Sequence, residues 1–318
     1  MKKSLIFLAL LILSFVLLEG LAWFVSANDY KKRRNETSLK PIEYKLPTFL
    51  KDMYSLEKFC DDEDTDCINL RNPILIGNDK PITIFGGSFA FGHYLTQQQN
   101  FAYKLAEQLN RPVYNRAIAG LGINNMLYQI TSSKFYRVVP PSDLVFYVMI
   151  DDHYRRSMIK AFHPVEHYES AHYKYNPKKD KMEITNFIPV IEQLEKLYIV
   201  KLFRNYYVQN YLKDVKNADK ITEDMLIRFI KSREKLEKRW GNKIDFVVVF
   251  YQEISFSSLL KEKLEKNGFI VVSTDELTKE DLNNEFYKQQ DNGHPTEEAW
   301  NLLTPLIIQK LYEKGVKL

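Results

Sequence analysis

Residues 81–92 read PITIFGGSFAFG, a short β-branched run that ends in two glycines and a serine. This pattern predicts a buried strand over 81–87 that stops at a sharp turn. Glycine permits such a turn, so Ser88 would stand at the end of the strand, close to the amide donors of a following helix. A phosphate-binding turn is the alternative, but the glycine spacing matches neither the P-loop nor the dinucleotide fingerprint.

After this turn, predicted strands and helices alternate along the chain. Apolar runs predict further strands at 112–118, 142–150, 243–251 and 269–273. Helical spacing predicts helices at 100–110, 124–135, 222–239, 255–267 and 296–313. Five strands separated by helices predict a doubly wound parallel sheet in a three-layer α/β/α sandwich. Its functional residues are expected at the carboxyl ends of the strands.

The rest of the chain divides into an apolar start, a lead-in and an insertion. Residues 28–80 are polar and poorly periodic, which is typical of a stalk leading into a domain at 81–318. At about 160–220 the alternation breaks in a stretch rich in proline, tyrosine and lysine, followed by helical periodicity. We interpret this stretch as an inserted helical and aromatic segment that packs on the domain as a lid.

Residues 1–27 begin with two lysines and continue with an apolar run from Leu5 to Ala27. Twenty or so apolar residues suffice to cross a bilayer. A cleaved signal peptide is the alternative, since Val25-Ser26-Ala27 resembles a cleavage site, but the run exceeds the usual apolar region of about 7–15 residues. The segment therefore predicts an uncleaved, single-pass transmembrane anchor.

The basic residues at 31–34 favour a cytoplasmic domain under the positive-inside rule, although large domains translocate largely regardless of flanking charge. The chain has only two cysteines, Cys60 and Cys67, and their close spacing favours a disulfide in an exported protein. Two free thiols or an incomplete metal site are the alternatives. We expect a domain outside the cytoplasm, periplasmic or on the cell surface.

Composition and histidine spacing exclude other classes of function. The 318 residues carry a net charge of only +4, with basic residues interspersed among acids, so no nucleic-acid partner is expected. His163, His167 and His172 fit no standard metal motif. We therefore expect neither a metal nor a cofactor.

An acid and a histidine stand three positions apart in DNGHP, at Asp291 and His294. Pro295 and the acids after it are a good helix start, which explains the helix but not this pair. An acid beside a histidine fixes its tautomer and stabilises the imidazolium. Such a histidine acts as a general base when a hydroxyl such as that of Ser88 lies within reach.

Taken in order, the blocks around Ser88, NRAIAGLG, MIDDHYRR and DNGH resemble the SGNH hydrolases, the GDSL-type lipase and esterase family. The resemblance covers about 82–160 and 240–312. It implies a flavodoxin-like parallel sheet and an ester hydrolase.

The resemblance also implies roles for particular residues. Ser88 matches the nucleophile and also the first oxyanion-hole amide of the family. Gly120 matches the second amide donor. Asp291 and His294 match the closing pair, in which the histidine deprotonates the serine and the acid orients the histidine.

The chain departs from the family pattern at two places. The family's Gly-Asp-Ser is replaced by Gly86-Gly87-Ser88, which removes an acid that is not catalytic. Asp151 stands where an asparagine would donate to the oxyanion. An ionised carboxylate there opposes the developing charge by about 4 kcal/mol at 4 Å and an effective dielectric of about 20, and this would cancel the contribution of an oxyanion donor.

Three arrangements would relieve this conflict at Asp151. The carboxyl is protonated, or it turns away to pair with Arg155 or Arg156, or another group such as His153 supplies the donor. We favour the arginine pairing. The alternative interpretation of this block is a solvated helix start capped by Asp152.

The predicted anchor and the resemblance together indicate a membrane-tethered serine esterase or O-acyltransferase that works through an acyl-serine intermediate. Its expected substrates are ester-linked groups, O-acetyl groups foremost, on envelope glycans or lipids. The alternative is a catalytically degenerate domain that binds glycans or helps to assemble the envelope, with Asp151 as the sign of lost catalysis. Oligomeric state and acyl length are not indicated by the sequence.

Overall fold

The computed structural model describes an α/β domain and a few short stretches outside it, at residues 14, 18, 56–59, 68–157, 173–176, 179, 181–184, 215–252, 257–284, 286–289 and 293–318. None of the helices in these ranges combines the length and apolarity that a membrane span requires. Apart from two positions, the expected anchor at 1–27 lies outside the described residues.

The centre of the domain is a five-stranded, fully parallel sheet with the order β4-β3-β5-β8-β9. Its strands are β3 (Ile82–Gly86), β4 (Val113–Asn115), β5 (Leu144–Met149), β8 (Asp245–Phe250) and β9 (Ile270–Ser273). By chain order within the sheet this is 2-1-3-4-5, the flavodoxin-like order. The five-stranded parallel sheet predicted from the apolar runs is therefore confirmed.

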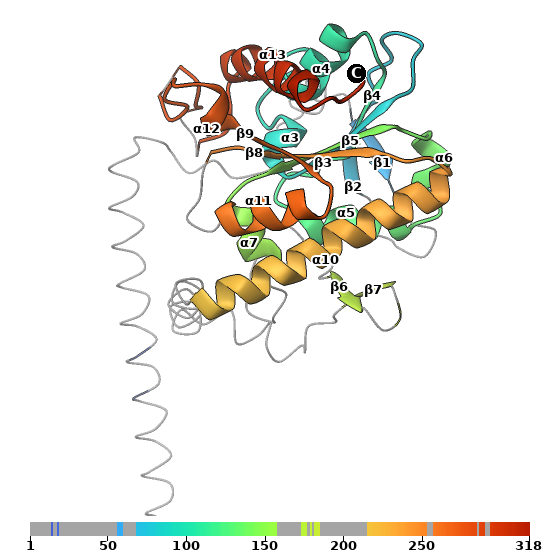
Figure 1. Ribbon diagram of the computed structural model, residues 1–318, viewed down its shortest axis with the longest axis vertical. Coiled ribbons are helices and arrows are strands. Elements are labelled where there is room, and N and C mark those ends of the chain that lie inside the picture. The colour runs from blue at the N-terminus through green and yellow to red at the C-terminus, as the bar shows by residue number, and fades with distance from the viewer. Residues whose placement is uncertain are drawn as a thin grey trace, which may run out of the picture.

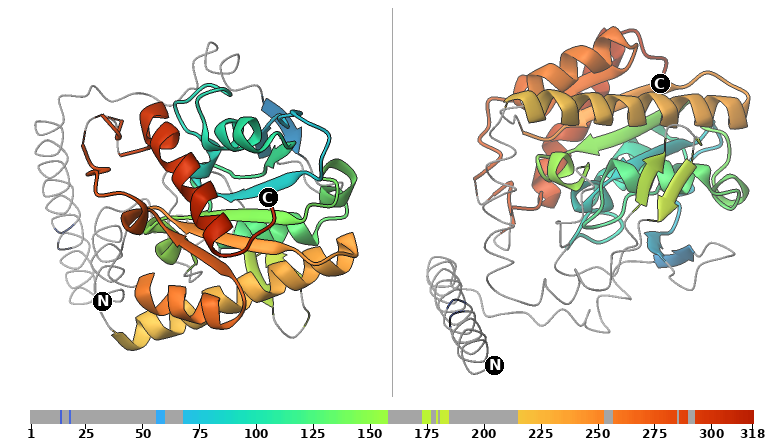
Figure 2. Two further views of the ribbon diagram at one scale, coloured as in Figure 1. Left: turned by 45° about the horizontal axis from the view of Figure 1, so that its top comes forward. Right: turned by 90° about the horizontal axis from the view of Figure 1, so that it is seen from below.

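Helices cover both faces of this sheet, as Figure 1 shows, with α4 and α13 on one side and α5, α10 and α11 on the other. Figure 2 shows the same two layers from other directions. The helices are α3 (Ser88–Phe91), α4 (Phe101–Leu109), α5 (Ile123–Thr131), α6 (Phe135–Val138), α7 (Asp152–Ser157), α10 (Val215–Trp240), α11 (Ser257–Lys266), α12 (Thr274–Leu277) and α13 (Glu297–Glu313). The predicted three-layer sandwich is thus the observed architecture.

Strand β5 supplies side chains to the cores on both faces, because successive residues of a strand point to opposite sides. Phe146 packs edge-on against Phe101 of α4, with ring centroids 5.8 Å apart. Its neighbour Tyr147 points the other way and packs against Phe229 of α10 at 5.1 Å. Burial on both faces explains why this run is apolar throughout.

The lead-in contains structure that its polar sequence did not predict. Strands β1 (Leu56–Phe59) and β2 (Ile68–Arg71) pair as an antiparallel hairpin. Ile74 then exchanges two backbone hydrogen bonds of 2.9 Å with Val113 at the start of β4. The last residues of the expected 28–80 lead-in therefore pack on the α/β domain.

The expected insertion at about 160–220 lies mostly outside the described residues. Within it, β6 (Tyr173–Asn176) and β7 (Lys181–Ile184) form a second antiparallel hairpin. Helix α10 begins at Val215, earlier than the helix predicted for 222–239.

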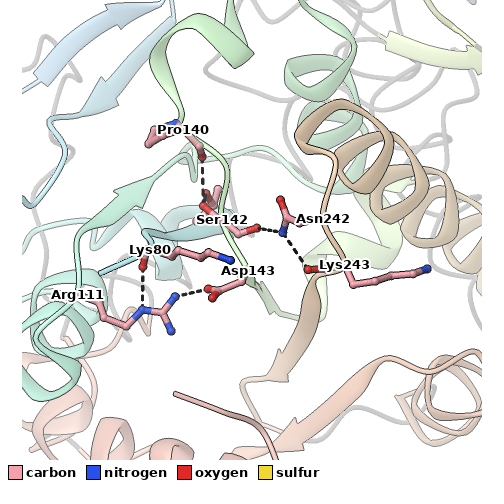
Figure 3. A network of polar contacts seen from close by, with 8 residues as sticks. Lys80, Arg111, Pro140, Ser142, Asp143, Asn242 and Lys243 are labelled. Atoms are coloured by element: carbon pink, nitrogen blue, oxygen red, sulfur yellow. Dashed lines mark hydrogen bonds and ion pairs between the residues drawn. The ribbon is translucent and has the colours of Figure 1, made fainter. Parts of the chain in front are cut away.

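Polar contacts tie together the segments that lead into the strands, at the amino edge of the sheet (Figure 3). Arg111 donates to the carbonyl of Lys80 at 2.8 Å and forms an ion pair with Asp143. Asn242 donates to the carbonyl of Ser142 at 3.1 Å. These contacts fix the end of the sheet opposite to the one where the strands deliver the predicted site residues.

Candidate active site

Ser88 is the first residue of α3 and lies directly beyond the carboxyl end of β3. The turn begins at Gly86, whose φ of 147° is outside the range that other residues adopt. A Cβ there would lie 2.9 Å from the carbonyl oxygen of Val148 on the neighbouring strand. The sharp turn predicted from the glycines is present, and it leaves Ser88 nearly buried, with 8% of its surface exposed.

A loop from the end of β4 lies beside this turn. The amide of Ile118 donates to the carbonyl of Gly86 at 3.1 Å, and Asn115 donates through its side chain to the carbonyl of Ala90 in α3 at 2.8 Å. Gly120 follows with a φ of 79°, in the left-handed region that favours glycine. The predicted amide donor therefore belongs to a loop that is hydrogen-bonded to the turn that carries Ser88.

His294 packs on the helix that Ser88 begins, although the two residues are far apart in the chain. Its ring centroid lies 5.2 Å from that of Phe89 and 5.0 Å from that of His93. The side chain of Gln289 donates to the carbonyl of His93 at 3.3 Å, and the amide of Gln289 donates to the carbonyl of His294 at 2.8 Å. This loop therefore fixes His294, which is 6% exposed, against α3.

The acid predicted to orient His294 lies outside the described residues, because Asp291 falls in the gap between 289 and 293. The same holds for Cys60 and Cys67 and for His163, His167 and His172. Their predicted roles remain predictions. Thr296, two residues after His294, caps α13 by accepting a hydrogen bond from the amide of Ala299 at 3.3 Å.

Two acidic residues, Asp151 and Asp152, stand where α7 begins after β5. Asp151 is exposed. Asp152 is the first residue of α7 and forms an ion pair with Arg156 at 3.1 Å. The predicted pairing of Asp151 with an arginine stays a prediction.

His153 is fully buried, and its Nε2 lies 2.6 Å from the position that a Cβ of Gly87 would occupy. Its Nδ1 lies 3.0 Å from the hydroxyl of Tyr147, and its Nε2 is buried without a hydrogen-bond partner among the described residues. Burial, and to a lesser extent the Arg156 charge, holds the pKa of His153 well below 6.5, so its ring is neutral near pH 7. A buried Nε2 cannot touch a substrate oxygen, which argues against His153 as the direct oxyanion donor.

Arg71 was not predicted as a site residue, because it belongs to the expected lead-in. It is 1% exposed and donates to the carbonyls of Phe91, Gly92 and Leu95 at 2.5, 2.6 and 2.7 Å. These carbonyls lie at and beyond the end of α3, the helix that begins with Ser88. The only signal in the sequence is a single arginine at the end of a short apolar stretch, INLR.

Comparisons with known proteins give similarity in structure only. No family model and no curated protein matches the chain. It is similar to the solved structure of a lipolytic protein of the G-D-S-L family from Desulfitobacterium hafniense, at 11% identity over 73% of this chain and 100% of that chain, with a TM-score of 0.41.

Two further solved structures are carbohydrate-active enzymes. An acetyl xylan esterase from Butyrivibrio proteoclasticus is 12% identical over 79% of this chain and 68% of that chain, with a TM-score of 0.40. A family two carbohydrate esterase from Clostridium thermocellum is 8% identical over 78% of this chain and 67% of that chain, also with a TM-score of 0.40. These likenesses concern the fold, and the function of this chain is argued below from its own residues.

Proposed function

We propose that this chain is a serine esterase or O-acyltransferase of SGNH type. The observation that carries the proposal is the packing of His294 on α3, next to the turn that presents Ser88. Nucleophilic acyl transfer requires a hydroxyl and an imidazole. Ser88 begins α3 at the carboxyl edge of the sheet, and His294 packs on Phe89, the next residue of that helix, which supports these two roles. Gly120 comes from a loop hydrogen-bonded to the same turn.

In the first half-reaction, His294 accepts the proton of the Ser88 hydroxyl while the serine oxygen attacks the ester carbonyl. The backbone amides of Ser88 and Gly120 donate to the oxyanion of the tetrahedral intermediate. The intermediate collapses to an acyl-serine, and the protonated His294 delivers its proton to the departing alcohol. Asp291 holds the imidazole in the tautomer that makes this transfer work.

In the second half-reaction, His294 deprotonates the acceptor, the acceptor oxygen attacks the acyl carbonyl, and Ser88 leaves with the proton that His294 returns to its oxygen. Water as the acceptor gives ester hydrolysis, and a sugar hydroxyl gives O-acyl transfer. We propose O-acetyl groups on envelope glycans or lipids as the substrate, because the apolar segment at 5–27 would hold the domain at a membrane.

Membrane attachment and export are a separate part of the proposal. The length of the apolar segment and the close spacing of Cys60 and Cys67 support an uncleaved anchor and a domain outside the cytoplasm. We expect the mature protein to retain its first residues and to sediment with membranes after a salt wash. A mature amino terminus after Ala27 would refute the anchor.

A fluorophosphonate probe tests the catalytic proposal directly. We expect the wild-type protein to be labelled, the Ser88→Ala variant not to be labelled, and p-nitrophenyl acetate turnover to fall by at least about 10³-fold in that variant. A wild-type protein that is folded but neither labelled nor active would favour the degenerate glycan-binding module instead. Comparing acetyl release with and without an oligosaccharide acceptor then separates hydrolysis from transfer.

A further inference from the structure

We propose that Arg156 is the positioning residue that supplies positive charge to the oxyanion site, a role that rests on the function proposed above. Arg156 lies in α7, between the turn that carries Ser88 and the loop that carries Gly120. The proposed mechanism gives this site two backbone amides and no charged donor. The arginine places a full cation at the same corner of the sheet.

The guanidinium is held in place on several sides. One terminal nitrogen, Nη1, donates to the carbonyl of Leu121 at 3.1 Å, and the other, Nη2, contacts the carboxylate of Asp152 at 3.1 Å. The Cβ and Cδ of Arg156 lie 3.3 and 3.9 Å from the position that a Cβ of Gly122 would occupy. Only 18% of the side chain is exposed, so the charge is held close to protein and partly away from water.

The distance between the Arg156 guanidinium and Gly87, the residue before Ser88, limits how far the positive charge lies from the Ser88 amide. Nη1 lies 3.1 Å from the position that a Cβ of Gly87 would occupy. Adding the lengths of the three covalent bonds between that position and the amide nitrogen of Ser88 gives a separation between Nη1 and this nitrogen of at most about 7.5 Å. At this distance in a partly buried site, a cation stabilises an oxyanion appreciably.

Two titratable groups beside Arg156, those of His153 and Tyr147, carry no positive charge near pH 7. His153 faces the same turn but is neutral near pH 7, because burial and then the Arg156 charge lower its pKa. Burial keeps the phenol of Tyr147 protonated by raising its pKa, with Arg156 opposing that shift. Asp152, the carboxylate paired with Arg156, offsets part of the positive charge and is 37% exposed through its side chain.

Two variants that each neutralise one charge test the inference, with p-nitrophenyl acetate as the substrate. Arg156→Gln removes the cation, and Asp152→Asn removes its partner, so both break the same ion pair while shifting the local charge in opposite directions. We expect Arg156→Gln to lower kcat roughly 10-fold to 50-fold with KM unchanged, and Arg156→Lys to retain more of kcat. Asp152→Asn loses one contact of the guanidinium but keeps the cation, so it should lower kcat less than Arg156→Gln does.

A merely structural role would give a different pattern. If Arg156 only holds Leu121 through the ion pair, both Arg156→Gln and Asp152→Asn should lower kcat together and in step with their loss of thermal stability, and that result would overturn the inference. Fluorophosphonate labelling separates the two levels of the proposal. An unlabelled wild type refutes the esterase itself, whereas an Arg156→Gln variant labelled at the wild-type rate with unchanged kcat refutes only the role of Arg156.

Discussion

The two glycines before Ser88 are required for different physical reasons. Gly86 has a positive φ, so its role follows from backbone conformation. Gly87 has a φ of −93°, which any residue adopts, yet a Cβ there would lie 2.6 Å from Nε2 of His153. The sequence predicted the tight turn, but it did not reveal this crowding, because the crowding atoms belong to residues distant in the chain.

We expect Gly87→Ala to lower both stability and activity. The added methyl would meet the fully buried His153 ring and the carbonyl oxygen of Leu121, which would lie 3.0 Å away. Neither group can withdraw easily, so the free energy of unfolding should fall by about 1–3 kcal/mol and kcat/KM should fall by at least about tenfold. Urea denaturation and p-nitrophenyl acetate kinetics measure the two effects.

Gly122→Ala is the matched control for this substitution. Gly122 also has an ordinary φ, −138°, but the nearest atom to its added Cβ is a side-chain carbon of Arg156 at 3.3 Å. Its loss of stability should therefore be smaller. Equal losses in the two variants would show that crowding against His153 is not what keeps Gly87 a glycine.

At the scale of elements, α3 illustrates why a short helix needs outside support. Four residues cannot form a stable helix by themselves, and the carbonyls at a helix end need donors from elsewhere. Arg71 of β2 supplies donors to three carbonyls at and beyond this end. The chain thus uses a residue that precedes the predicted domain to hold the element that presents Ser88.

Replacing Arg71 by methionine should therefore affect both folding and catalysis. Several buried carbonyls would lose their donors, and we expect the free energy of unfolding to fall by about 3 kcal/mol or more. Because α3 would lose its support, kcat should also fall in the protein that remains folded. Denaturant titration and kinetics under native conditions measure these effects separately.

Arg111→Met is the control at the opposite edge of the sheet. Arg111 is also buried and binds a carbonyl and a carboxylate, but it lies at the amino ends of the strands (Figure 3). The Arg111→Met variant should lose stability, while its kcat should stay at the wild-type value. An Arg71→Met variant that loses stability alone, as Arg111→Met should, would show that Arg71 does not position the helix that begins with Ser88.

The elements that the sequence predicted correctly are those with a strong apolar period and clear turn signals. The strand predicted at 142–150 is observed at Leu144–Met149, and the helix predicted at 100–110 at Phe101–Leu109. The hairpin of β1 and β2 was missed, because four-residue strands in a polar stretch carry too little alternation to stand out. Pairing with each other, rather than local preference, makes them strands.

At the scale of the whole molecule, the order of the strands explains how distant residues meet. In the 2-1-3-4-5 order, β3 and β5 are neighbours at the point where the chain reverses its direction across the sheet. Ser88 follows β3, and His153 and Arg156 follow β5. This placement was predictable from the alternation of strands and helices, whereas the burial of His153 was not, because it depends on packing against Tyr147 and Gly87.

The neutral, buried His153 makes the stability of the whole domain sensitive to acid. Its pKa is well below 6.5 in the folded protein and near 6.5 in the unfolded chain. Below pH 6.5 the unfolded chain binds a proton that the folded protein does not, so acidification favours unfolding. The free energy of unfolding should therefore fall by about 1.4 kcal/mol per pH unit from pH 6.5 down to the folded pKa.

Urea denaturation of three proteins between pH 7 and pH 5.5 checks this expectation. His153→Asn has no titrating ring at this position. The part that His153 contributes to the slope of the free energy of unfolding against pH should therefore disappear in this variant. Tyr147→Phe loses the hydroxyl that lies 3.0 Å from Nδ1 but leaves the imidazole buried, and burial is the main cause of the depressed pKa, so its slope should remain. A His153→Asn variant with the full wild-type slope would place the acid sensitivity elsewhere in the chain.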